Sequence, residues 1–312
     1  MTKAALSALI RPLIEPLLPD WVEPHWFATH EEALEVAPQA EIGWFDMYDQ
    51  ESMKAAITAA ENLNWLNSIY AGLDFLPLDL LHERGVTVTN GVGINALTIA
   101  EYTVMLMLAH AKGYRDVVRA MDRKEWLLDS PGKRELAGER VLLLGLGAIG
   151  KLIKTRLEAF EMEVVPVRRS GADGSLRPDE WRGKLGEFDW VILAVPSTAE
   201  TVGMIGTDEL AAMKPNAVLV NIARGDVVVQ DALVEALQSK QIEAALLDVT
   251  DPEPLPEDHP LWDLQNAQIT MHLSGRAQEK MFQRSADRFL ANLERYRAGE
   301  ALEPVMDLKL GY

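Results

Sequence analysis

The stretch RVLLLGLGAIG, residues 140–150, limits the possible folds of this chain more than any other. An unbroken apolar run leads into a G-x-G-x-x-G turn, and the helical pattern IGKLIKTRLEAF begins within that turn. A second apolar run follows at 164–167, within the stretch EVVPV. A strand, a tight glycine turn, a helix and another strand form a βαβ unit, in which the two strands run parallel. The stretch therefore predicts a parallel α/β domain.

Short apolar runs and helical patterns alternate along most of the chain. We predict strands at 22–27, 40–47, 64–72, 86–90, 141–144, 163–167, 190–195, 217–222, 244–248 and 268–271. We predict helices at 8–18, 51–63, 76–85, 97–119, 149–160, 230–239 and 277–297. The pattern predicts two Rossmann-like doubly wound α/β domains with parallel sheets. One is a flavodoxin-like domain, residues 1–93 with 277–312, and the other is a dinucleotide-binding domain, residues 94–276.

Composition narrows the class of function. The 312 residues are 48% hydrophobic and 25% charged, as in an ordinary globular protein. A net charge of −18 without a polybasic run argues against binding of nucleic acid or of an anionic membrane. The chain has no cysteine and no uncharged apolar run of membrane-spanning length, and Arg11, Glu15 and prolines interrupt its amino terminus. We therefore expect a cytoplasmic protein without disulfides, signal peptide or membrane span.

The glycine turn predicts a binding site for a dinucleotide. Gly145 permits the tight turn, Gly147 lets the backbone approach a pyrophosphate, and Gly150 lets helix and strand pack closely. The helix that follows supplies N–H donors and the positive end of its dipole. The alternative is a glycine-rich turn without a ligand.

Two arginines and a serine stand where such a site usually carries an acidic residue. Arg168, Arg169 and Ser170 follow the strand at 163–167. An acid would accept bonds from the ribose 2′-hydroxyl, whereas an arginine favours a 2′-phosphate. One charge-assisted hydrogen bond contributes about 1.5–3 kcal/mol net, which is about one to two decades in affinity. We therefore expect NADPH to be preferred, with NAD possible; the alternative is solvated surface arginines and bound NAD.

Three further stretches follow the glycine turn in order: VNIARGDVV (220–228), LLDVTDPEPLPEDHPLW (246–262) and ITMHLSG (269–275). Together with GLGAIG they resemble the D-isomer-specific 2-hydroxyacid dehydrogenase family, especially its glyoxylate/hydroxypyruvate reductase branch. The resemblance covers the chain from about residue 40 to the end. It implies a substrate domain and a dinucleotide-binding domain that face a common cleft, and a homodimer built on the predicted helix at 97–119.

The resemblance implies a catalytic set of Arg224, Glu253 and His272. The chemistry of hydride transfer to a 2-oxo acid needs these residue types. A histidine can deliver a proton to the ketone oxygen, and a neighbouring carboxylate orients the ring and favours the imidazolium. An arginine can clamp the substrate carboxylate and polarise the carbonyl. No metal is needed. Taken singly, each residue has an ordinary structural interpretation.

Other family positions carry over by resemblance. The cofactor-binding positions are Gly145, Gly147, Ala148, Ile149, Gly150, Arg168, Arg169, Ser170, Val195, Pro196, Ser197, Thr201, Ile222, Ala223, Arg224, Asp248, His272 and Ser274. The substrate-binding positions are Ala71, Gly72, Arg224, His272, Trp44 and Tyr70. Phe45, Met47, Tyr48 and Trp126 are further candidates, and the alternative for the first-domain aromatics is the domain core. Two positions depart from the family pattern: Met271 replaces a usual proline and Thr250 a usual phenylalanine.

The sequence thus predicts an NADPH-preferring reductase of 2-oxo acids to D-2-hydroxy acids, with histidine as the general acid. The substrate is glyoxylate or hydroxypyruvate, or a larger apolar 2-oxo acid. The alternatives are a nucleotide-sensing corepressor or scaffold on the same fold, an NAD-linked member of the family, and a formate- or phosphite-type dehydrogenase.

Overall fold

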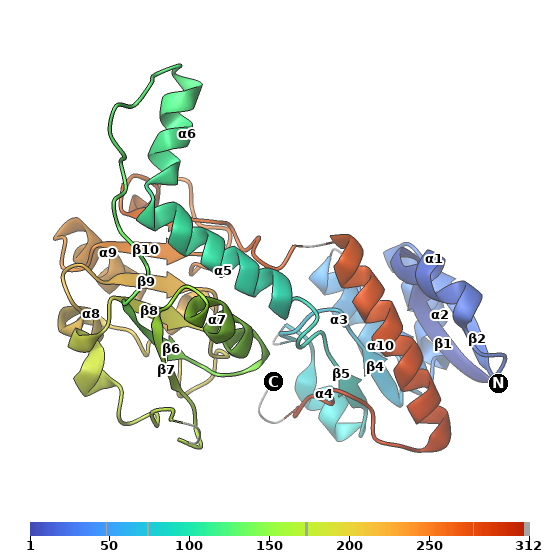
Figure 1. The fold of residues 1–312 in the computed structure, drawn as a ribbon. Coiled ribbons are helices and arrows are strands. Elements are labelled where there is room, and N and C mark those ends of the chain that lie inside the picture. The colour runs from blue at the N-terminus through green and yellow to red at the C-terminus, as the bar shows by residue number, and fades with distance from the viewer. Residues whose placement is uncertain (48, 74, 172–173, 277, 309–312) are drawn as a thin grey trace. The chain divides into compact units, whose positions relative to one another are not determined.

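A computed structural model of the chain describes residues 1–312 except 48, 74, 172–173, 277 and 309–312 (Figure 1). The chain divides into two compact units: Met1–Asn95 with Ala277–Tyr312, and Ala96–Arg276. Each unit contains one sheet, and every strand pair in both sheets is parallel. Two parallel-sheet α/β units confirm the predicted fold class.

The first unit has a five-stranded sheet in the order β2-β1-β3-β4-β5. Its strands are β1 (Thr2–Ser7), β2 (Val22–Phe27), β3 (Ile42–Trp44), β4 (Trp65–Asn67) and β5 (Thr87–Thr89). This is the flavodoxin-like order, in which the strand order reverses between β1 and β3. The strand at Thr2–Ser7 was not predicted, because the run TKAALS is short and opens with two polar residues.

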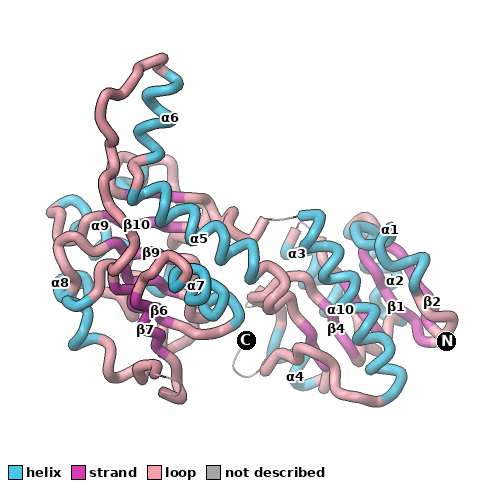
Figure 2. Tube along the Cα trace, viewed as in Figure 1, coloured by secondary structure: helices cyan, strands magenta, loops and turns pink. Residues whose placement is uncertain are grey.

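Helices cover both faces of this sheet. They are α1 (Arg11–Ile14), α2 (His30–Val36), α3 (Gln50–Ala59), α4 (Leu78–Glu83) and α10 (Gln278–Ala298). The last helix, α10, lies across the sheet (Figure 2), where Phe289 stacks on Trp65 with ring centroids 5.0 Å apart. The helix predicted at 8–18 is broken into short turns, since Pro12 and Pro16 each occupy the first positions of a new turn.

The second unit has a six-stranded sheet in the order β11-β10-β9-β8-β6-β7. Its strands are β6 (Arg140–Leu144), β7 (Glu163–Val167), β8 (Trp190–Leu193), β9 (Val218–Asn221), β10 (Ala244–Leu247) and β11 (Ala267–Ile269). Most of their residues are buried, as the continuous apolar runs predict for strands covered on both faces. The strand that carries the glycine turn, β6, lies between β7 and β8, so the strand order reverses there. Ligands of open α/β sheets bind at such a switch point.

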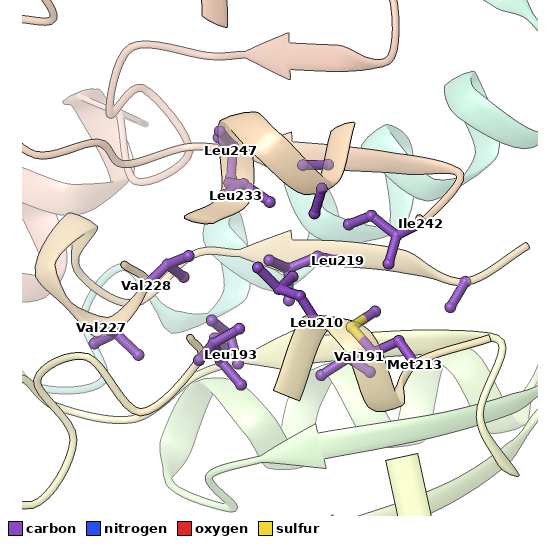
Figure 3. Close-up of a cluster of buried hydrophobic side chains, with 14 of the residues drawn as sticks. Val191, Leu193, Leu210, Met213, Leu219, Val227, Val228, Leu233, Ile242 and Leu247 are labelled. Carbon is purple, nitrogen blue, oxygen red and sulfur yellow. The ribbon is translucent and has the colours of Figure 1, made fainter. Parts of the chain in front are cut away.

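Two layers of helices cover the second sheet. The helices are α5 (Ala96–Ala111), α6 (Tyr114–Asp122), α7 (Ala148–Glu158), α8 (Thr207–Ala212) and α9 (Gln230–Gln238). On one face α5 packs with α7, and the opposite face carries the core around Leu219 and Leu233, where α8 and α9 pack (Figure 3). Among the described helices, none is long and apolar enough to cross a membrane.

The single helix predicted at 97–119 is two helices. Gly113 separates α5 from α6 at φ 62° and ψ 30°, a left-handed conformation that a continuous helix cannot contain. A side chain at this position would also approach the backbone N of Gly132 to 2.7 Å. As a result α6 stands out from the rest of its unit (Figure 1).

Candidate active site

The glycine turn between β6 and α7 combines tight packing with an open backbone. A Cβ at Gly145, which has φ 104°, would lie 2.4 Å from the carbonyl oxygen of Ala194, and a Cβ at Gly150 would lie 2.1 Å from that of Gly145. Only glycine fits at these two positions. Among the described residues, a Cβ at Gly147 would meet nothing beyond its chain neighbours within 4 Å. The turn therefore leaves Gly147 and the first-turn N–H groups of α7 open to an anionic group such as a pyrophosphate.

The arginine segment lies directly beside this turn. Strand β7 ends at Val167, which is in register with Leu144 and accepts a hydrogen bond from the Gly145 N–H at 3.1 Å. Arg168 follows and is half-buried, and its N–H donates to the Leu176 carbonyl at 3.0 Å. Arg169 is exposed and lies 3.5 Å from a carboxylate oxygen of Glu200. Two cationic side chains and Ser170 therefore follow the strand next to the glycine turn.

The loop after β8 is linked to the loop after β9. Thr201 Oγ1 donates to the carbonyl of Pro196 at 2.6 Å and accepts from the Thr198 N–H at 2.8 Å, which closes the loop on itself. Ser197 Oγ donates to Asp226 Oδ2 at 2.6 Å. The loop that carries the predicted cofactor positions Val195, Pro196 and Ser197 is thereby held against the turn that carries Arg224.

Arg224 leaves the sheet on a turn that Asn221 shapes. Asn221, the last residue of β9, donates from Nδ2 to the Arg224 carbonyl at 2.9 Å and accepts from the Ala223 N–H at 3.0 Å. Ile222 and Ala223 are buried. Arg224 Nη1 donates to the Ala223 carbonyl at 2.8 Å. Gly225 follows because a Cβ there would lie 2.0 Å from the Thr250 carbonyl oxygen.

His272 and Glu253 form the pair that the sequence predicted. His272 Nδ1 lies 2.8 Å from Glu253 Oε2, and both side chains are partly exposed. The other carboxylate oxygen of Glu253 accepts the Thr250 N–H at 3.2 Å, and Thr250 Oγ1 donates to the Pro252 carbonyl at 3.1 Å. The carboxylate therefore orients the ring and leaves Nε2 as the nitrogen that can serve a substrate. The backbone N–H of Thr250 thus helps to hold that carboxylate.

The backbone at His272 is strained and is held by Asp248. Met271 and His272 have φ values of 55° and 57°, in the left-handed region that β-carbon atoms disfavour. The carboxylate of Asp248 accepts from Thr270 Oγ1 at 2.7 Å, from the Leu273 N–H at 3.1 Å and from both N–H and hydroxyl of Ser274. Its carbonyl accepts the His272 N–H at 2.6 Å.

This structural role of Asp248 was missed in the sequence, where resemblance suggested only a contact to the cofactor. Asp248 is buried and its carboxylate is occupied by the His272 loop. The signal that could have indicated this is the pair of hydroxyl residues, Thr270 and Ser274, on either side of His272. Because proline fixes φ near −65°, the conformation of Met271 also excludes the proline that is usual in the family.

The substrate-binding positions predicted in the first unit differ in exposure: those on the turn after β4 are accessible, and Trp44 is buried. Ala71 and Gly72 lie on a partly exposed turn after β4, where the Ala71 carbonyl accepts from Asn90 Nδ2 at 2.8 Å. Tyr70 is partly exposed and donates from its hydroxyl to the Met47 carbonyl at 3.2 Å. Trp44 does not belong with them.

The prediction that Trp44 contacts substrate is wrong for its side chain. Trp44 is 0% exposed and packs on Phe289 with ring centroids 4.9 Å apart, so it belongs to the core. Phe45 is likewise a core residue. Tyr48, a further candidate, lies outside the described residues. Trp126 is exposed in the loop after α6.

A buried acid, Asp46, supports the turn that contains Ala71 and Gly72. It was not singled out in the sequence. Asp46 Oδ1 accepts from Ser68 Oγ at 2.8 Å, and Oδ2 accepts from the Ile69 N–H at 2.5 Å and Trp44 Nε1 at 2.6 Å. Burial raises the pKa of this carboxyl from 3.8 to about 6, although all three hydrogen bonds act to lower it. No salt bridge to Asp46 occurs among the described residues.

Comparison with known proteins places the chain in a family. Residues 104–274 match the NAD binding domain of the D-isomer specific 2-hydroxyacid dehydrogenases. A glyoxylate reductase/hydroxypyruvate reductase of Mus musculus is 32% identical over 276 residues, 83% of this chain and 82% of that protein. A D-3-phosphoglycerate dehydrogenase of Methanocaldococcus jannaschii is 32% identical over 259 residues, 81% of this chain and 49% of that protein, so the chain spans about half of this relative.

A solved structure shows the same fold over the whole length. It is that of a D-isomer specific 2-hydroxyacid dehydrogenase family protein from Aeromonas salmonicida subsp. salmonicida A449, with a TM-score of 0.88 and 27% identity over 98% of this chain and 99% of that one. The matching family model and the relative that is 32% identical define the class: an oxidoreductase with two parallel α/β units and a nucleotide-binding domain. The chain belongs to the D-isomer specific 2-hydroxyacid dehydrogenase family, which confirms the resemblance found in its sequence.

Asp46 predicts a pH dependence of stability. Because its pKa is raised on folding, its stabilising contribution is present below about pH 4 and is lost as the pH rises through about 6. Relative to Asp46→Asn, the free energy of unfolding of the wild type should fall by about 2 kcal/mol between about pH 4.5 and 7.5. Urea denaturation of both proteins from pH 4.5 to 7.5 measures the difference. A difference that stays constant with pH would contradict the raised pKa.

Proposed function

We propose that the protein is an NADPH-preferring reductase that converts 2-oxo acids to D-2-hydroxy acids. Its substrate would be glyoxylate, hydroxypyruvate or a larger apolar 2-oxo acid. The observation that carries the proposal is the contact of 2.8 Å between His272 Nδ1 and Glu253 Oε2. Glu253 and His272 follow strands β10 and β11. The glycine turn and Arg224 follow β6 and β9 of the same parallel sheet. Relatives that are named glyoxylate reductase/hydroxypyruvate reductase support the substrate class.

The residues of the chain divide the reaction among them. A bound reduced nicotinamide supplies the hydride that the carbonyl carbon of the substrate accepts. His272 Nε2 donates a proton to the carbonyl oxygen, which becomes the hydroxyl of the product, and solvent then reprotonates the ring. Glu253 holds the Nδ1 side of the ring and thereby orients it. Arg224 pairs with the substrate carboxylate and polarises the carbonyl.

The second unit would hold the cofactor. Gly147 and the first turn of α7 fit the pyrophosphate, because a Cβ at Gly147 would meet no described residue beyond its chain neighbours within 4 Å. Arg168, Arg169 and Ser170 follow the neighbouring strand, and their chemistry suits a 2′-phosphate rather than a ribose hydroxyl. We assign cofactor binding also to the other predicted positions on these loops: Gly145, Ala148, Ile149, Gly150, Val195, Pro196, Ser197, Thr201, Ile222, Ala223, Asp248 and Ser274.

The first unit would hold the substrate. We assign the N–H groups of Ala71 and Gly72 to the substrate carboxylate and Tyr70 to the remainder of the substrate. Residues 1–93 and 277–312 are then the substrate-binding domain, and 94–276 the dinucleotide-binding domain.

Removal of the general acid tests the mechanism. The variant His272→Ala should lose about two to four decades of kcat/KM for glyoxylate, the usual contribution of general acid catalysis. Its Kd for NADPH, measured by fluorescence titration, should stay within about twofold of the wild type. The control His82→Ala removes an exposed histidine of α4 and should keep full activity. Normal turnover by His272→Ala would remove this residue from the mechanism.

Reversal of the charge at Arg168 tests the cofactor preference. In Arg168→Asp the ratio of kcat/KM for NADPH to that for NADH should fall by about one to two decades, because a charge-assisted bond to the 2′-phosphate is lost. Lys184→Asp changes the net charge equally at an exposed position of the 3-10 helix Arg182–Glu187 and should leave the ratio unchanged. An unchanged ratio in Arg168→Asp would mean that the arginine is a surface charge.

A homodimer formed through α5 and α6 is the expected assembly. Exposed apolar side chains gather on α6 and the loop that follows it: Tyr114, Val117, Met121, Trp126 and Leu128. Trp126 and Leu128 are 89% and 97% exposed, which is unusual for the free surface of a monomer. A second copy that packs on this surface would bury them.

Light scattering coupled to size-exclusion chromatography tests the dimer. The wild type should have the mass of two chains, and Met121→Asp combined with Leu128→Asp should have the mass of one, since each charge would be buried unpaired at the interface. Leu17→Asp, at an exposed apolar position of the first unit, should leave the mass unchanged. A wild type that is monomeric at micromolar concentration would contradict the assembly.

A further inference from the structure

Asp46 stands two residues beyond β3, where it bridges that strand to the loop after β4. The carboxyl is buried, and the donors that it accepts from among the described residues are all neutral: Ser68 Oγ, the Ile69 N–H and Trp44 Nε1. Two of these donors belong to the segment that leads into the turn at Ala71 and Gly72. A buried carboxyl without a cation is costly, and a leucine or valine would pack in a core at lower cost. We therefore attribute the presence of an acid at this position to the loop that its hydrogen bonds hold.

The hydrogen bonds extend from Asp46 to the turn. Ser68 Oγ donates to Asp46 and also accepts the Tyr70 N–H at 3.2 Å. The Tyr70 hydroxyl returns to the Met47 carbonyl at 3.2 Å, next to Asp46 in the chain. Residues 68, 69 and 70 are thus each tied to the segment after β3, directly before Ala71. The other side of the turn is held by Asn90 Nδ2, which donates to the Ala71 carbonyl.

We propose that Asp46 is a positioning residue for the substrate carboxylate: it holds Ser68–Tyr70 so that the N–H groups of Ala71 and Gly72 keep the direction in which they bind that carboxylate. The inference rests on the proposed function, which assigns the substrate carboxylate to this turn. Asp46 itself touches no substrate. Backbone donors bind well only when their direction is fixed beforehand, and a displacement of about 1 Å can reduce the rate by about a hundredfold.

An asparagine can replace Asp46, and an alanine cannot. The amide oxygen of Asp46→Asn can accept from Ile69 and Trp44, as Oδ2 does, and its NH₂ group can donate to Ser68 Oγ. Asp46→Ala leaves all three donors without their acceptor. The two variants therefore separate the bridging geometry from the charge.

Steady-state kinetics with glyoxylate and NADPH test the inference. Asp46→Ala should raise the KM for glyoxylate by about ten- to a hundredfold, with a smaller change in kcat and an unchanged Kd for NADPH. Asp46→Asn should restore the KM to within about threefold of the wild type. The matched control is Asp49→Ala, which removes the N-cap of α3 in the same unit, where Asp49 accepts from the Ser52 N–H at 2.9 Å. It destabilises the unit without a contact to the turn and should leave the KM unchanged.

Two results overturn the inference alone: an active wild type whose KM is unchanged in Asp46→Ala, and a KM that rises equally in Asp49→Ala. If Asp46→Ala does not fold, Ser68→Ala decides, because it removes the bridge to Tyr70 and should raise the KM in the same direction; an unchanged KM then overturns the inference. A wild type that reduces no 2-oxo acid overturns the proposed function, and the inference with it.

Discussion

All strands of the second sheet run parallel, and the candidate site depends on this constraint. Parallel strands present their carboxyl ends at one edge, so the loops that follow β6 to β11 leave the sheet from the same side. The glycine turn, the arginine segment, Arg224, Glu253 and His272 all lie on those loops. Residues more than a hundred positions apart thus share one edge of the sheet, with no need for a long-range pairing signal in the sequence.

Both sheets use a buried carboxylate in a comparable place. Asp248 follows β10 and accepts four donors from the loop after β11, the neighbouring strand. Asp46 lies just beyond β3 and accepts two donors from the loop after β4, again the neighbouring strand. A carboxylate has two oxygens and about four acceptor positions, so one side chain can fix several donors of a loop at once. Each acid thereby fixes the loop that follows the neighbouring parallel strand.

The sequence predicted the second unit better than the first, for a physical reason. Apolar runs such as 164–167 mark strands that are covered on both faces, and β7 has the bounds 163–167 that the sequence predicted. The first unit has strands of three residues, such as Ile42–Trp44, which are too short for periodicity to define their ends. Trp44 was misjudged because an aromatic residue at a strand end suits a pocket and a core equally. Asp46 could not be found, since its partner Ser68 lies 22 residues away.

The strained backbone at His272 explains why Asp248 has so many partners. Two consecutive residues with positive φ cost roughly 1–2 kcal/mol each, so the loop would relax unless other contacts held it. The Asp248 carboxylate bonds to residues on both sides of the strained pair, and its carbonyl accepts the His272 N–H. The family usually limits this loop with a proline, which the φ of Met271 excludes. In this chain, hydrogen bonds to one buried aspartate supply the rigidity that a ring would otherwise give.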